Sequence, residues 1–88
     1  MAVDRRPNAR LRALLAEAGW SNEQCARAVN AAGAEIGLVL RYDRTSVAHW
    51  LTGTQPRPPV PQLLAETLSR RLGRVATPAG AGFTQHPA

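Results

Sequence analysis

Apolar residues recur at helical spacing in four stretches of this chain, and a glycine follows each stretch, at positions 19, 33, 53 and 73. Residues three and four apart lie on one face of a helix, so each stretch predicts an amphipathic helix with one buried side. Glycine commonly follows a helix because it adopts the left-handed backbone conformation at little cost. With 88 residues the chain has room for one small core. We therefore expect an all-α fold, a compact bundle of four to five helices.

The first two helices carry recognisable start signals. Asn8 can cap a first helix whose apolar stripe is Leu11, Leu14, Leu15 and Ala18. Ser21 and Gln24 have the spacing of a capping box, which predicts a second helix from about Asn22 to the glycine at 33. Its buried face is expected to hold Cys25, Ala28, Val29 and Ala32, with Glu23, Arg27 and Asn30 turned outward.

Residues 34–43 form a connector with a different pattern. Here Ile36, Leu38, Leu40 and Tyr42 alternate with other residues, a period of two that favours a short extended segment. A run this short is also compatible with a helical extension packed on the core. We expect an ordered, partly extended connector rather than a helix.

The third helix is predicted to span about 45–52, with the Thr45 hydroxyl as its cap. Val47, Trp50 and Leu51 share one face, so we interpret Trp50 as a core residue rather than a base-stacking one. The opposite face is polar or small and is free to meet a ligand; it carries Arg44, Ser46, Ala48 and His49.

The remaining segments set the expected domain boundaries. Residues 54–61 are proline-rich and predict a stiff connector, and Pro61 can lie in the first turn of a fourth helix that reaches about Leu72. We expect a domain over 8–73, a flexible basic arm over 1–7, and a mobile tail or linker over 74–88. The arm's arginines are interpreted as a solvated charge run, with contact to DNA as the alternative.

The charge of the chain points to a polyanionic partner. All 11 basic residues are arginines, against 6 acidic residues, and the net charge is +5. The guanidinium group donates two parallel hydrogen bonds that suit phosphate and the edge of guanine. A GC-rich genome would enrich arginine together with alanine, glycine and proline, so codon usage is an alternative explanation for the absence of lysine.

Catalytic and metal chemistry find little support in the residues. Cys25 is the one cysteine and falls on a predicted buried face, and one of the two histidines, His86, lies in the predicted tail. The chain has neither a glycine-rich phosphate loop nor histidines and carboxylates at metal-ligand spacing. We therefore expect no enzyme activity, no cofactor and no metal. Because signal-peptide and membrane-span patterns are absent, we expect a cytoplasmic protein that does not enter the membrane.

Three blocks of sequence resemble the lambda-repressor-like (XRE) helix-turn-helix family, and within it the N-terminal regulator domains common in actinomycetes. They are NARLRALLAEAGWSNEQ at 8–24, ARAVN at 26–30 and RTSVAHWLTGTQPR at 44–57. The resemblance covers residues 8–73. It implies that the second helix crosses the DNA backbone and that the third, the recognition helix, enters the major groove.

The resemblance also implies a set of DNA-binding residues. Ser21 and Asn22 stand where the family's second helix meets a phosphate, and Arg57 looks like another phosphate contact. Base edges would be read by Arg44, Thr45, Ser46 and His49, and we add Arg41 of the connector to the expected DNA contacts. Two features depart from the family: the connector is much longer than the usual turn, and Asn22 replaces the more frequent glutamine.

The sequence thus predicts a sequence-specific DNA-binding transcriptional regulator, or the DNA-binding module of one, acting on double-stranded DNA of the nucleoid. The alternative is a protein-interaction adaptor on a helix-turn-helix scaffold, since a fold does not by itself determine function. The apolar connector motivates this alternative, as a surface for another protein or for a second copy in a homodimer through Ile36, Leu38, Leu40 and Tyr42.

Overall fold

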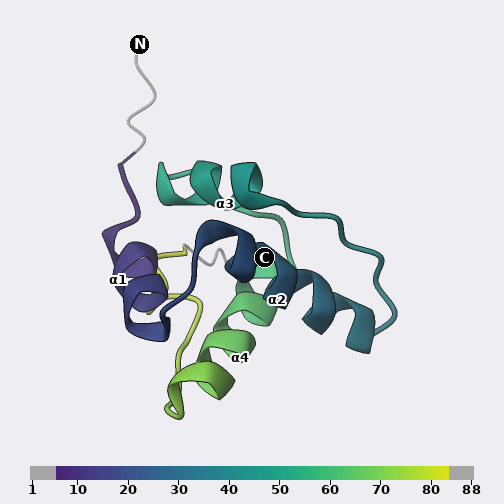
Figure 1. The fold of residues 1–88 in the computed structure, drawn as a ribbon. Helices are drawn as coiled ribbons and strands as arrows, with labels where there is room; N and C mark the ends of the chain where they lie inside the picture. Colours follow the sequence, from purple (N-terminus) through teal and green to yellow (C-terminus); the bar gives the residue numbers. More distant parts are fainter. Residues whose placement is uncertain (1–5, 84–88) are drawn as a thin grey trace.

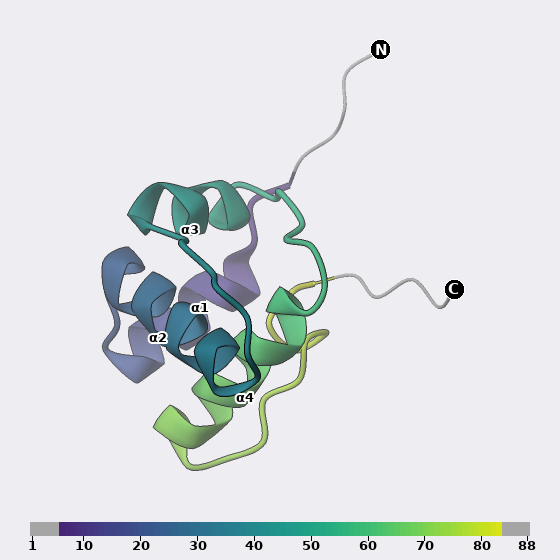
Figure 2. The ribbon, with the colours of Figure 1, turned by 90° about the vertical axis from the view of Figure 1, so that its right-hand side faces the viewer.

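The computed structural model describes residues 6–83, and this range contains four α-helices and no strand. The helices are α1 (Ala9–Ala18), α2 (Asn22–Glu35), α3 (Arg44–Leu51) and α4 (Val60–Leu72). Helices α3 and α4 lie on opposite sides of α2, as both ribbon views show (Figures 1 and 2). The predicted all-α bundle is confirmed. None of the described helices is both long and apolar enough to cross a membrane.

The expected start signals of α1 and α2 are present. Asn8 Oδ1 accepts a hydrogen bond from the Leu11 backbone N–H at 3.0 Å, and Gly19 ends α1 in the left-handed conformation at φ 71°. The capping box of α2 is complete, because Gln24 N donates to Ser21 Oγ at 3.1 Å and Ser21 N donates to Gln24 Oε1 at 2.8 Å. Both helices therefore begin where local sequence predicts.

The prediction that helix α2 ends at Gly33 is wrong, because the helix continues to Glu35. Gly33 is buried, and a Cβ atom there would clash with Leu40 Cδ1. Its role is to let the connector pack closely against α2. The left-handed residue that follows the helix is Gly37, at φ 81°.

The core is built from one face of each helix. Its fully buried members include Leu11, Val29, Val47, Leu64 and Leu68. Trp50 is 4% exposed, which confirms its interpretation as a core residue, and Trp20 packs half-buried against the same cluster. On α2 the buried face differs from the prediction at two positions. Ala26, which the prediction left out, is buried, whereas Ala28 is only half-buried.

The predicted mobile tail beginning at residue 74 is wrong for residues 74–83. Ala81 and Phe83 belong to the core cluster, at 0% and 2% exposure. Asn8 Nδ2 donates to the Ala81 carbonyl at 2.8 Å, and Arg10 Nη1 donates to the Ala79 carbonyl at 3.2 Å. This segment therefore packs on α1, because the one phenylalanine of the chain gains a buried site there. The rest of the predicted tail, 84–88, and residues 1–5 of the predicted arm lie outside the described residues.

Candidate nucleic-acid interface

The start of α3 is capped by Asp43 and not, as predicted, by Thr45. Asp43 is in extended conformation, and its Oδ1 accepts from the Ser46 backbone N–H at 3.0 Å and from Ser46 Oγ at 3.2 Å. Thr45 already lies inside the helix, so its hydroxyl stands on the exposed first turn. Two hydrogen bonds hold the pKa of the Asp43 carboxyl below its ordinary value of 3.8. The bond from the Ser46 backbone N–H has the larger effect, and the bond from the Ser46 hydroxyl the smaller one. The carboxyl group is therefore ionised at neutral pH.

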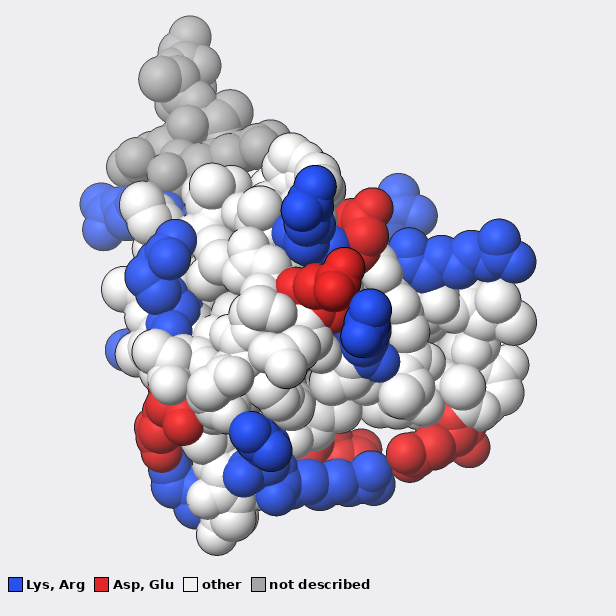
Figure 3. Space-filling view, in the orientation of Figure 1, with Lys and Arg blue, Asp and Glu red and all other residues white. Residues whose placement is uncertain are grey.

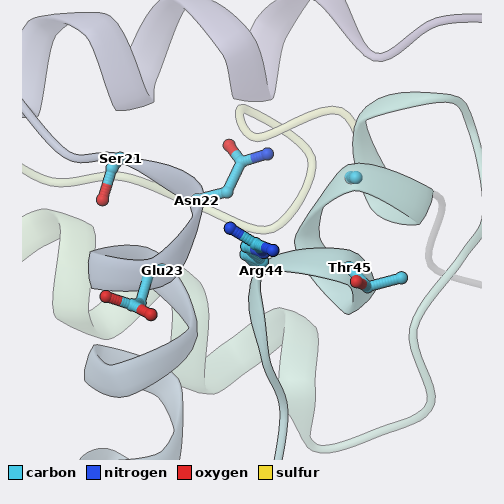
Figure 4. Close-up of a pocket in the computed structure, with 6 residues that line it drawn as sticks. Ser21, Asn22, Glu23, Arg44 and Thr45 are labelled. Atoms are coloured by element: carbon cyan, nitrogen blue, oxygen red, sulfur yellow. The ribbon is translucent and has the colours of Figure 1, made fainter.

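The N-terminal ends of α2 and α3 meet at an open groove. Its lining comes from the first residues of each helix: Ser21, Asn22 and Glu23 on one side, and Arg44, Thr45 and Ala48 on the other. In the close-up, Arg44 lies between the labelled residues of α2 and Thr45 (Figure 4). Four of the eight residues predicted to bind DNA are thus side by side, although they come from segments about twenty residues apart in the chain.

The other four predicted DNA contacts do not line this groove. His49 is exposed on α3, one turn beyond Thr45 and on the same side of the helix. Ser46 is half-buried and bonded to Asp43, so it helps to start the helix. Arg41 is exposed in the connector before α3, and Arg57 is exposed in the segment that follows it. Neither of these arginines lines the groove.

A hydrogen-bonded clamp holds the connector and α3 against α2. Asn30, which was predicted to face outward, is half-buried; its Nδ2 donates to the Tyr42 carbonyl at 2.9 Å and its Oδ1 accepts from Tyr42 N at 3.0 Å. The Tyr42 ring then meets Trp50 edge to face, with ring centroids 5.2 Å apart. Asn30 turns inward because it satisfies both backbone groups of Tyr42. The connector is therefore ordered and non-helical from residue 38 to 43, as expected.

This packing reduces the apolar surface that was predicted on the connector. Leu40 and Tyr42 pack against the core cluster, so they are not available as a partner surface. Ile36 remains 59% exposed, and the neighbouring Val39, which the prediction left out, is 81% exposed. The exposed apolar part of the connector is thus shorter than the sequence pattern indicated.

Some arginines of the described residues pair with carboxylates, and others do not. At the far end of the bundle Arg74 pairs with Glu17 at 2.6 Å, and Arg70 pairs with Glu66 at 2.5 Å and with Glu35 at 3.4 Å. In the space-filling view, acidic groups along the lower edge lie beside basic ones (Figure 3). Within residues 6–83, no carboxylate pairs with Arg44, which lines the groove, or with Arg41 and Arg57, which precede and follow α3 in the chain.

Sequence reasoning missed two acidic residues at this site, Asp43 and Glu23. Glu23 lines the groove and forms an ion pair with Arg27 at 3.3 Å, one helical turn later. Asp43 could have been found, because Asp43 and Ser46 have the same three-residue spacing as a capping box.

Cys25 occupies the core, as predicted, and is not part of the interface. Burial raises the pKa of its thiol to about 12, so it is protonated and unreactive at neutral pH. Within residues 6–83 no three histidine, cysteine, aspartate or glutamate side chains come together in a way that could hold a metal ion.

Comparison with known proteins identifies one family. The family model described as SP15 N-terminal domain matches residues 11–84, which include the four helices except the first two residues of α1, as well as the candidate interface. The match also extends over the tail segment that packs on α1. No curated protein and no solved structure matches the chain. Because the matched range covers most of its length, this chain belongs to the SP15 N-terminal domain family.

Proposed function

We propose that this domain binds double-stranded DNA in a sequence-specific manner and acts as a transcriptional regulator, or as the DNA-binding module of one, on the nucleoid. The observation that carries the proposal is the groove between α2 and α3, where the exposed start of α3 presents Arg44 and Thr45 beside Ser21 and Asn22. Arg41 and Arg57, which precede and follow α3 in the chain, are exposed, and neither pairs with a carboxylate within residues 6–83.

The electrostatics of the groove suit a phosphate backbone. Two helix N-termini converge there, and each adds free backbone N–H groups and the positive end of a helix dipole. Ser21 and Asn22, at the start of α2, can approach a phosphate while α3 turns toward the bases. Arg41 and Arg57 provide charge on the flanks of α3, where contacts position a protein without reading sequence.

The exposed face of α3 suits the major groove. Helix α3 has 8 residues. At 1.5 Å per residue it is about 12 Å long, and an α-helix with its side chains, about 10–12 Å in diameter, fits the width of the major groove of B-DNA, about 12 Å. Arg44 can donate two hydrogen bonds to guanine O6 and N7, and Thr45 and His49 can reach neighbouring base edges from one side of the helix.

The resemblance to XRE helix-turn-helix proteins supports the same proposal. The longer connector is the main departure, and the Asn30 clamp on Tyr42 explains how α3 can keep a defined position despite it. We therefore propose a helix-turn-helix variant in which an ordered connector replaces the tight turn.

The test begins by recovering duplexes from a genomic fragment library with the wild-type protein and measuring their affinity by fluorescence anisotropy. Arg44→Ala is then compared with Arg74→Ala. Both substitutions remove one positive charge, but Arg74 follows α4, whose C-terminal end lies on the opposite side of the molecule from α3 (Figure 1). We expect Arg44→Ala to weaken binding to the recovered duplex by roughly tenfold or more. Arg74→Ala should stay close to wild type.

Equal effects of the two substitutions would contradict the proposal, since binding would then depend on net charge and not on this surface. Circular dichroism of both variants ensures that a loss of affinity is not a loss of fold. Wild-type protein that recovers no duplex at low salt would also contradict it, because electrostatic attraction is strongest there.

A protein-interaction adaptor is the second candidate function. The exposed Ile36 and Val39 favour it, because neighbouring apolar side chains on a surface are typical of protein contacts. Light scattering separates the two functions. A protein that remains a monomer and ignores duplex DNA would favour the adaptor, whereas a dimer that binds duplex DNA would favour the regulator.

A further inference from the structure

Asp43 differs from every other carboxylate in residues 6–83, because it has no ion-pair partner. Glu17, Glu23, Glu35 and Glu66 each pair with an arginine. Asp43 follows Arg41 by two residues and directly precedes Arg44, yet it forms an ion pair with neither of them. The lone negative charge therefore lies at the leading tip of α3, next to the groove where Arg44 and Thr45 are exposed.

The geometry of Asp43 leaves one carboxylate oxygen available. Both hydrogen bonds that Ser46 donates go to Oδ1, and no described side chain donates a hydrogen bond to Oδ2. The residue is exposed, and the cap fixes its direction relative to the helix. Asp43 is thus an exposed carboxylate at the start of α3, in a hollow that it shares with Arg44 and Thr45.

A fixed acceptor with a negative charge is selective among base edges. Guanine O6 and N7 and thymine O4 are acceptors themselves, so they repel a carboxylate in the major groove. Adenine presents a donor at N6, but its N7 acceptor lies beside that donor. Cytosine presents its N4 amino group without an acceptor next to it in the groove, and it therefore fits the site best.

We propose that Asp43 is a specificity-determining residue that selects a cytosine, through its N4 amino group, at a base pair next to the one read by Arg44. This inference rests on the proposed DNA-binding function.

The test compares the duplexes that wild-type protein and Asp43→Asn recover from a library with a randomised site, at one salt concentration. Asparagine also caps helices and keeps the Oδ1 acceptor, but it removes the charge. The wild-type motif is expected to contain one position where cytosine is preferred over thymine by about tenfold. Asp43→Asn should lose that preference, keep the rest of the motif and bind non-specific duplex more tightly.

A second variant, Asp43→Ser, also retains a capping side chain and should lose the same preference. Thermal unfolding of each variant establishes that α3 is still formed. If wild type and both variants recover the same motif, the inference is wrong while the DNA-binding function stands. If wild type recovers a motif without a preferred cytosine, the inference is likewise wrong. Wild type that retains no duplex would overturn the proposed function itself, and this inference with it.

Discussion

Replacing Asn30 with alanine removes the clamp that joins α2 to the segment leading into α3. Two hydrogen bonds are lost, of 2.9 and 3.0 Å, both to the backbone of Tyr42. A typical hydrogen bond contributes about 0.5–1.5 kcal/mol net, and a buried group left without a partner costs about 1–3 kcal/mol. Because Asn30 and Tyr42 are half-buried, water can partly replace the lost bonds. We expect the free energy of unfolding to fall by about 2 kcal/mol.

For a domain of this size, each kcal/mol corresponds to about 4–8 °C in Tm, so Asn30→Ala should lower Tm by roughly 8–16 °C. Thermal unfolding followed by far-UV circular dichroism measures this shift. Asn22→Ala is the matched control, because Asn22 lies on the same helix and is also half-buried, but the structure gives its side chain no hydrogen bond. Its Tm should stay near that of wild type.

The clamp should also affect binding, since it orients α3. At a temperature where Asn30→Ala is folded, its affinity for the recovered duplex should be lower than that of wild type, through a faster dissociation rate. If Asn30→Ala melts within the error of Asn22→Ala, the clamp contributes nothing to stability and the argument for an ordered connector fails. Unchanged affinity with a lowered Tm would show that the clamp stabilises the fold without positioning α3.

Three further outcomes are expected. Phe83→Ala should lower the free energy of unfolding by about 3 kcal/mol in a urea titration, whereas Phe83→Leu should retain most of it; equal stability of Phe83→Ala and wild type would mean that the tail does not contribute to the core. The pKa of Asp43 is lowered in the folded state, so its stabilising effect is present above its ordinary value of 3.8 and is lost as the pH falls below that value. The Tm difference between wild type and Asp43→Asn should therefore narrow from pH 7 to pH 3, and a constant difference would contradict the shift. Arg57→Ala should reduce the slope of log affinity against log salt by about 1 and leave the recovered motif unchanged; a changed motif would mean that Arg57 reads bases.

Local sequence determined the helices of this protein. Their apolar spacing, the Asn8 cap and the Ser21 capping box act over three or four residues, so neighbouring residues suffice to predict them. The same local reasoning placed Trp50 in the core. It failed at Gly33, because glycine at that position serves a contact with Leu40 and not the end of a helix.

The tertiary structure decided which residues meet. The Asn30 clamp joins residues 12 apart and the Asn8 bond to Ala81 joins residues 73 apart, so neither leaves a periodic signal in the chain. For the candidate interface, resemblance selected Ser21, Asn22, Arg44 and Thr45, and the packing of α3 on α2 brings them to one groove. Their contact with DNA stays a prediction. The tertiary structure was also needed to see that Asp43 has no ion-pair partner. It is the one carboxylate within residues 6–83 that does not pair with an arginine.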